Sequence, residues 1–164
     1  MRAKYIILHH SATRDGNAFD WQAIRRFHKS WRYDGKIITE QEAHERIGRG
    51  EKGILSPWRD IGYHFGIEKI NDFHEILIGR LFGEPGAHCR QNGMNAQSWG
   101  ICFVGNYDEE EVLPEIWNFG LKLVKQLMML GRIERENVKG HREFADYKSC
   151  PGSKFDLEKF RSEL

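Results

Sequence analysis

The stretch KYIILHH, residues 4–10, constrains the fold most, because it is an apolar run that ends on two adjacent histidines. A half-buried strand alternates apolar and polar residues, whereas this run is apolar on both faces. It therefore predicts a short strand that is buried on both sides, as in sheets that helices cover on both faces. The small polar residues that begin at Ser11 predict a loop at the carboxyl end of this strand.

The chain that follows predicts one helix and then a long excursion. Asp20 is a suitable N-cap, and apolar residues recur at helical spacing from Trp21 to Trp31, which predicts an aromatic face packed against a sheet. Residues 32–60 mix charges with glycines and predict a loop with at most a short helix near 40–47. A connection of this length suggests a segment that borders a functional site.

The second half of the chain predicts a mixed sheet with further helices. Pro114 opens a long amphipathic helix with Gly131 as the expected C-cap, and Asp156 caps a final helix. Strands are expected at 61–69, 73–80, 98–107 and 137–144, with a hairpin turn at 71–73. The pattern is α/β: one domain spanning 1–164, without a separate wall-binding domain, in which helices flank a central mixed sheet.

Composition excludes several classes of partner. The 25 Lys and Arg residues balance 24 Asp and Glu residues, so a net charge of +1 gives no reason to expect nucleic acid. The four-residue apolar stretch near the N-terminus is too short for a signal peptide, and no run approaches the roughly 20 apolar residues of a membrane span. We therefore expect synthesis in the cytoplasm without a signal peptide, no membrane insertion, and a monomer.

Three residues have the chemistry and the positions of a zinc site. His9 ends the buried strand, and His141 lies where a later strand meets a loop, which is where α/β sheets place their ligands. Cys150 is one of three cysteines, an odd number that argues against a disulfide framework. Two imidazoles and a thiolate leave one coordination position for water, as in catalytic zinc sites. Spacing alone also allows that these residues are unrelated, and we take the single histidines 28, 44 and 74 to be ordinary side chains.

Five motifs extend this hypothesis: ILHHSAT, DIGYHFGI, PGAHCRQNGMNAQSWGICFVGNY, GHREF and KSCPGSKFDL. In this order, over residues 5–157, the chain resembles the zinc-dependent N-acetylmuramoyl-L-alanine amidases, which include amidase-type phage lysozymes and peptidoglycan recognition proteins. The resemblance implies a Zn²⁺ ion held by His9, His141 and Cys150. Because adjacent strand residues point to opposite faces, only one of the two histidines should reach the metal, and the family pattern selects His9 over His10.

The resemblance also implies roles around the metal. Tyr63 and Lys148 match catalytic residues of the family, a tyrosine beside the metal-activated water and a lysine that stabilises negative charge. His88 matches a substrate-binding histidine, although a surface-loop histidine is an equal alternative. Glu143 is expected to orient a ligand from the second shell, and is the alternative general base.

The sequence departs from the family pattern in two places. The excursion at 32–60 is longer than in compact phage amidases, and Trp99 stands where a smaller aliphatic residue is common. The aromatic residues Trp31, Tyr33 and Trp58 could rim the substrate groove and stack on sugar rings, or simply cover the first helix.

The implied function is hydrolysis of the amide bond between the lactyl group of N-acetylmuramic acid and L-alanine of the peptidoglycan stem peptide. A phage or prophage endolysin, released to the wall by a separate holin-type protein, fits a compact chain best. The alternatives are a cytoplasmic muropeptide-recycling amidase, a recognition module without catalysis, and a protein–protein inhibitor. Cys150 favours the enzyme over the recognition module, because inactive relatives usually lose this ligand.

Overall fold

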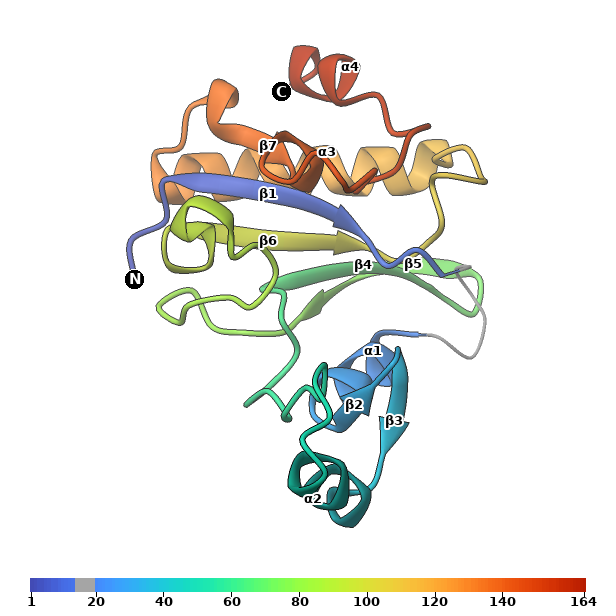
Figure 1. Cartoon of the computed structure of the whole chain (residues 1–164). Helices are drawn as coiled ribbons and strands as arrows, with labels where there is room; N and C mark the ends of the chain where they lie inside the picture. The colour runs from blue at the N-terminus through green and yellow to red at the C-terminus, as the bar shows by residue number, and fades with distance from the viewer. Residues whose placement is uncertain (14–19) are drawn as a thin grey trace.

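The computed structural model describes residues 1–13 and 20–164 and is built around a five-stranded sheet (Figure 1). The strand order is β5-β4-β6-β1-β7. Strand β1 pairs in parallel with β6 and β7, β4 pairs in parallel with β6, and β5 alone runs antiparallel, next to β4. The strands are β1 (Tyr5–His10), β4 (Phe65–Ile70), β5 (Phe73–Ile78), β6 (Ser98–Phe103) and β7 (Val138–Gly140). This arrangement confirms the predicted mixed sheet.

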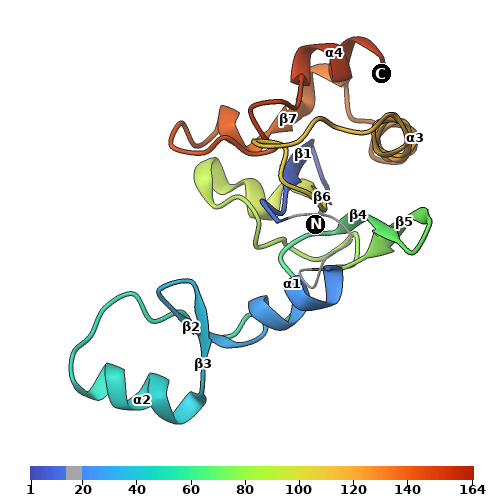
Figure 2. The ribbon, with the colours of Figure 1, turned by 90° about the vertical axis from the view of Figure 1, so that its right-hand side faces the viewer.

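Helices cover both faces of the sheet (Figures 1 and 2). Helix α3 (Pro114–Gly131) and helix α4 (Leu157–Ser162) lie on one face, and α1 (Trp21–His28) lies on the other. Short 3-10 helices occupy Gln91–Ala96, Arg135–Asn137 and His141–Glu143. The structure thus confirms an α/β fold with flanking helices. No helix in the described part of the chain is long and apolar enough to cross a membrane.

Strand β1 is buried on both faces, as its sequence predicts. The side chains of Ile6, Ile7 and Leu8 are fully buried. Ile6 and Leu8 belong to the main core beneath α3, whereas Ile7 belongs to a smaller cluster on the other face. By this alternation the side chain of His9 lies on the face of Ile7, and that of His10 on the face of Leu8.

The predicted cap residues act as caps, with one exception. Asp20 accepts a hydrogen bond from the backbone of Ala23 at 2.6 Å, and Asp156 caps α4 in the same way. The C-cap of α3 is Arg132, with a left-handed φ of 51°, so the prediction of Gly131 was wrong by one residue. Gly131 is needed for space instead, because a Cβ there would lie 2.9 Å from the side chains of Ile133 and Trp99.

Several predicted elements are shorter than expected. Strand β4 begins at Phe65 rather than residue 61, and β7 ends at Gly140, so His141 starts a 3-10 turn. The hairpin between β4 and β5 is confirmed, with Asn71 in the left-handed region at its turn. Helix α1 ends at His28, so the prediction that Trp31 belongs to it was wrong.

Residues 31–57 form a small projecting unit, which we call the arm. It contains the hairpin of β2 (Trp31–Tyr33) and β3 (Lys36–Ile38), followed by helix α2 (Glu40–Gly48). The short helix was predicted, but the hairpin was not, although Asp34-Gly35 is a common two-residue hairpin turn. The arm extends to the side of the molecule on which the 141–152 loop also projects (Figure 2).

Candidate metal centre and active site

The two candidate imidazoles meet because β1 and β7 are parallel neighbours. Leu8 is paired with Gly140, so the next residues, His9 and His141, lie side by side at the carboxyl edge of the sheet, His9 within the last two residues of β1 and His141 directly after β7. Their ring centroids are 4.8 Å apart. His9 is almost completely buried, whereas His141 is partly exposed at the start of its 3-10 turn.

Cys150 joins the two histidines through a loop that folds back on the turn. The backbone N–H of Arg142 donates to the carbonyl of Cys150 at 2.8 Å, which holds the loop against the residues that follow β7. The Sγ atom of Cys150 lies 3.5 Å from Nδ1 of His9. One potential ligand atom from each of His9, His141 and Cys150 lies within 4.8 Å of the others. The structure therefore brings together all three residues of the predicted site.

Asp108 and Arg142 fix the loop on both sides of Cys150. One carboxylate oxygen of Asp108 accepts from the Ser149 hydroxyl at 2.6 Å, and the other accepts from the backbone N–H of Ser153 at 2.7 Å. The guanidinium of Arg142 donates to the carbonyl oxygens of Ser149, Gly152 and Phe155. These bonds hold the thiol in place before any metal binds.

His10 contributes to the centre through its backbone. Its side chain points to the opposite face from that of His9, where Nδ1 accepts from the backbone N–H of Tyr107 at 3.2 Å and Nε2 lies 3.8 Å from Asp108. Its own backbone N–H lies 3.4 Å from Sγ of Cys150. A donor in this position stabilises a thiolate.

Burial sets the protonation of the metal-free centre. Burial, then the neighbouring His88 and His141, lower the pKa of His9 well below its usual value. Burial and Lys148 lower the pKa of His141 to about 4, so both imidazoles are neutral near pH 7. Burial raises the pKa of Cys150 to about 12, although the His10 N–H and Lys148 oppose this shift. The thiol must therefore release a proton when it binds a metal.

The cluster fits a zinc ion. Neutral imidazole and thiolate are the ligands that zinc prefers, and three of them leave a fourth tetrahedral position open. The Nε2 atom of His141 is buried, and within residues 1–13 and 20–164 it has no hydrogen-bond partner. A buried imidazole nitrogen without a partner is costly unless a ligand satisfies it.

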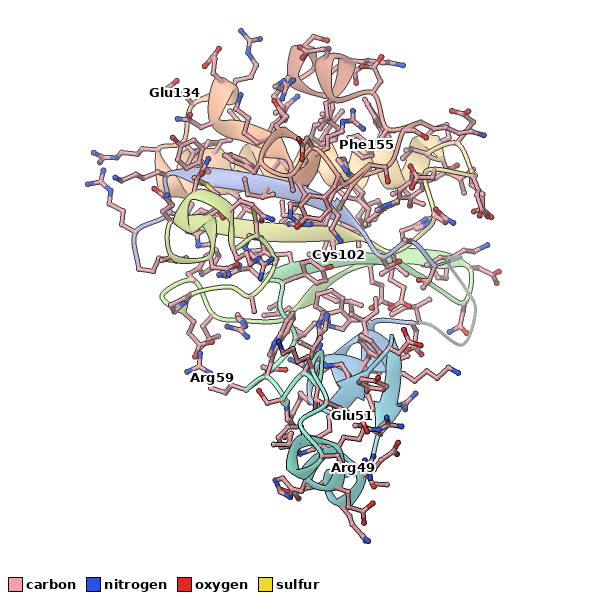
Figure 3. The ribbon with its side chains drawn as sticks, in the orientation of Figure 1. Arg49, Glu51, Arg59, Cys102, Glu134 and Phe155 are labelled. Carbon is pink, nitrogen blue, oxygen red and sulfur yellow. The ribbon has the colours of Figure 1, made fainter. Side chains whose placement is uncertain are left out.

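Tyr63, two residues before β4, lies beside the cluster and packs against Trp21 of α1. Its ring centroid is 5.1 Å from that of His9 and 5.8 Å from that of His28. Burial, and then the thiols of Cys102 and Cys150, raise the pKa of the Tyr63 phenol well above its usual value. Figure 3 labels Cys102 within the sheet, where it is paired with His9. The phenol is therefore a hydrogen-bond donor near neutral pH rather than a phenolate base.

Lys148 and Glu143 occupy different surroundings. After burial, the charge of Lys148 is a further influence on the pKa of both His141 and Cys150, which it lowers, and its ammonium lies 5.6 Å from the centroid of the Tyr147 ring. A carboxylate oxygen of Glu143 accepts from the backbone N–H of Gly140 at 2.7 Å, and Arg161 donates to the same oxygen at 3.0 Å. Glu143 thus fixes the turn that carries His141.

His88 reaches the cluster from the segment before β6. Its Nδ1 atom lies 3.0 Å from Nε2 of His9, and only 8% of the residue is exposed. The sequence indicated a histidine near the substrate, but it gave no sign of this direct bond to a candidate ligand.

The aromatic residues of the arm mostly pack against its own side chains. Trp31 contacts His44 at 5.5 Å between ring centroids, and the Arg46 guanidinium lies 4.2 Å from the Tyr33 ring. Trp58, at the base of the arm, packs against His28, with ring centroids 4.5 Å apart and the ring planes inclined by 32°. A row of rings therefore runs from Trp58 through His28 to Tyr63.

Sequence reasoning missed Asp108, Arg142 and the backbone role of His10. Asp108 lies 42 residues before Cys150 in an ordinary polar stretch, and no local pattern marks it. Arg142 stands inside the GHREF motif, so its position next to His141 was the one available signal.

The fold and the site together define a class of protein: a single α/β domain with a cluster of two histidines and one cysteine, which could hold a metal ion, at the edge of its sheet. A family model described as N-acetylmuramoyl-L-alanine amidase matches residues 1–153, and the chain belongs to this family.

Individual relatives agree with this assignment. The endolysin of Escherichia phage T7 is 28% identical over 160 residues, which are 94% of this chain and 83% of the endolysin. Peptidoglycan-recognition protein SC1a of Drosophila melanogaster is 31% identical over 97 residues, or 58% of this chain, and the match spans only about half (49%) of that relative. The amidase LysC from Clostridium intestinale URNW has the same fold, with a TM-score of 0.66 at 24% identity over 100% of this chain and 86% of LysC.

Proposed function

We propose that this protein is a zinc-dependent N-acetylmuramoyl-L-alanine amidase, which hydrolyses the amide bond between the lactyl group of N-acetylmuramic acid and L-alanine of the stem peptide. The cluster of His9, His141 and Cys150, in a chain of the amidase family, is the observation that carries the proposal. Peptidoglycan is the substrate, as the names of the family and of the recognition-protein relatives suggest.

The side chains around the cluster have the properties that amide hydrolysis needs. When bound, zinc lowers the pKa of a water molecule to about 7 and polarises a carbonyl group. The neutral phenol of Tyr63 donates a hydrogen bond, which orients the attacking water or the scissile carbonyl. Lys148 supplies positive charge for the oxygen on which negative charge develops. Both oxygens of Glu143 are already engaged, so we assign it an orienting role rather than that of a base.

An endolysin is the physiological role that we favour. The match to the T7 endolysin covers almost the whole of this chain and most of that protein. We expect the protein to act on the cell wall after release from the cytoplasm. A muropeptide-recycling amidase would share the chemistry but prefer soluble fragments. A recognition module would bind peptidoglycan without cutting it.

Metal analysis together with mass spectrometry of digested peptidoglycan tests the proposal. We expect one zinc per chain, and products that carry a newly freed L-alanine amine and a newly formed lactyl carboxylate. Chelation should abolish the activity, and added zinc should restore it. Full activity after chelation, or cleavage at another bond, would contradict the proposal. Comparing intact sacculi with soluble muropeptides separates the endolysin from the recycling enzyme.

A further inference from the structure

The two ring nitrogens of His9 face different partners. Nδ1 lies 3.5 Å from Sγ of Cys150 and so belongs to the cluster. Nε2 lies 3.0 Å from Nδ1 of His88, and both residues are buried. Because a metal takes the unprotonated nitrogen of an imidazole, coordination by Nδ1 requires the proton of His9 to be on Nε2. The Nε2–H group of His9 then needs a hydrogen-bond acceptor, and Nδ1 of His88 lies within hydrogen-bond distance.

From this geometry we infer that His88 is a positioning residue, whose Nδ1 accepts the Nε2–H of His9 and so holds His9 in the tautomer and orientation that bind the metal. The inference rests on the metal site of the proposed function. Ligating histidines commonly donate their second N–H to a carboxylate, a carbonyl or water, and a neutral imidazole can serve as the same kind of acceptor.

The surroundings of His88 fix its ring in this direction. A Cβ added at Gly86 would lie 2.3 Å from Cδ2 of His88, and one added at Gly100 would lie 2.5 Å from the same atom. Two glycines therefore make the room that the ring occupies. The Oδ1 atom of Asn95 accepts from the backbone N–H groups of His88 and Cys89, both at 2.8 Å, which secures the main chain beside the ring.

A neighbouring histidine supports the same packing without reaching the cluster. His64 accepts from the backbone N–H of Gly100 at 3.0 Å through Nδ1, and its Nε2 lies 3.0 Å from the carbonyl of Glu84. Its ring packs edge-on against His88, with centroids 5.7 Å apart. Since both nitrogens of His64 have backbone partners, its tautomer and orientation are fixed. The His64 ring therefore restricts the position of the His88 ring that packs against it.

The burial of His88 favours positioning over direct contact with substrate. Nδ1 faces His9, so the buried Nε2 carries the ring proton of neutral His88, for which the backbone of Ser98 offers a hydrogen bond. Neither nitrogen is therefore accessible at the surface for a substrate group. The expectation of a substrate-binding role remains a separate prediction, which the experiment below can also detect.

The experiment measures the zinc affinity of the metal-free protein by competition with a chromophoric chelator. His88→Phe keeps a ring but removes the acceptor, and it should weaken zinc binding by about 10–100-fold, the usual effect of losing a second-shell partner. His88→Asn places an amide oxygen near the position of Nδ1 and should restore most of the affinity. His44→Phe, on the arm, is the matched control and should bind zinc like the wild type. Thermal unfolding of the metal-free variants checks that the fold is intact.

Imidazole ¹⁵N NMR of the zinc-loaded wild type tests the inference without any variant. We expect His9 to carry its proton on Nε2 and to bind zinc through Nδ1. Coordination through Nε2 would overturn the inference, as would equal zinc affinity in the wild type and a folded His88→Phe variant. If that variant bound zinc normally but raised KM, His88 would be a substrate-binding residue instead. If the wild type bound no zinc, the proposed function itself would fail.

Discussion

The backbone N–H of His10 lies 3.4 Å from the Sγ atom of Cys150, although the two residues are 140 positions apart in the chain. The adjacent His9 contributes its side chain to the same sulfur, at 3.5 Å. The two consecutive histidines therefore approach Cys150 in different ways, one through the imidazole and one through the main chain.

This difference predicts unequal effects of alanine at the two positions. His9→Ala removes a ligand and should weaken zinc binding by more than the roughly 100-fold upper range of a lost second-shell partner. His10→Ala keeps the backbone donor, so it should bind zinc far better, while losing some stability because the Tyr107 N–H loses its acceptor. Zinc titration and thermal unfolding measure the two effects. Equal loss of zinc in both variants would rule out the choice of His9.

Replacing the thiol of Cys150 tests the third candidate ligand of the metal site. Cys150→Ser should abolish stoichiometric zinc and lysis, whereas the metal-free fold should lose only about 1–3 kcal/mol for burying a hydroxyl. Cys89→Ser is the matched control, because Cys89 is also buried but is not part of the cluster. Zinc content by mass spectrometry and turbidity loss of cell walls give the readouts. A Cys150→Ser enzyme that keeps zinc and activity would show that the metal, if needed, binds elsewhere.

Tyr63 and Lys148 should affect turnover rather than metal binding. Tyr63→Phe and Lys148→Ala should each keep full zinc occupancy and near-normal binding to peptidoglycan, because neither residue belongs to the ligand cluster. The value of kcat should fall by about 10²-fold or more, the usual scale for an acid–base group or an oxyanion donor. Losses confined to KM would assign these residues to substrate binding. An unchanged kcat in Tyr63→Phe would return Glu143 to consideration as the base.

Asp108 should act on zinc affinity through the loop that carries Cys150. Asp108→Ala removes the acceptor for both Ser149 and Ser153, and it should weaken zinc binding by about 10-fold. Asp108→Asn keeps one acceptor oxygen and should lose less. Glu109→Ala, one residue along, provides the control. If Asp108→Ala bound zinc as tightly as Glu109→Ala, the loop would hold its shape without this carboxylate.

His28 should make stability depend on pH. Burial, and then Arg32 and Arg80, lower its pKa from 6.5 to about 4, so the folded protein resists protonation that the unfolded chain accepts. The stabilisation from neutral His28 is therefore complete above about pH 6.5 and is lost as the pH falls towards 4, at about 1.4 kcal/mol per pH unit. Other buried histidines also make the stability of the wild type depend on pH. The test therefore compares the pH dependence of the wild type with that of a variant that lacks His28.

Urea unfolding of metal-free wild type and His28→Gln, between pH 4.5 and 7, measures that difference. As the pH falls, the free energy of unfolding should decrease less steeply in the variant. The difference between the two slopes should correspond to about one proton fewer taken up on unfolding. Parallel curves for the two proteins would show that His28 titrates normally.

The parts of the fold that the sequence predicted are those with local physical causes. The double-sided apolar run identified β1, and the side chains of Asp20 and Asp156 marked two helix starts because capping acts within four residues. The end of α1 was misjudged because Trp31 continues the helical spacing while belonging to β2. Spacing alone could not show that its ring packs on His44 of the arm.

In the candidate site, too, the sequence predicted the residues with a local pattern and missed the contacts that depend on the completed fold. His9 and His141 could be located because each lies at the carboxyl end of a strand, and parallel neighbours bring such ends together. The bonds from Asp108 to the Cys150 loop and from His88 to His9 join segments 41 to 79 residues apart, and they depend on the completed fold. No local sequence pattern around Asp108 or His88 could have predicted these contacts.

The base of the arm has a consequence for protein engineering. The chain leaves at His28 and returns at Trp58, whose backbone N–H donates to the carbonyl of His28 at 2.8 Å while the two tilted rings pack together. An excursion that starts and finishes at one point can be lengthened, shortened or exchanged without altering the register of any sheet strand. The same junction therefore gives protein engineers a place to graft a new binding element near the cluster of His9, His141 and Cys150 without rebuilding the sheet.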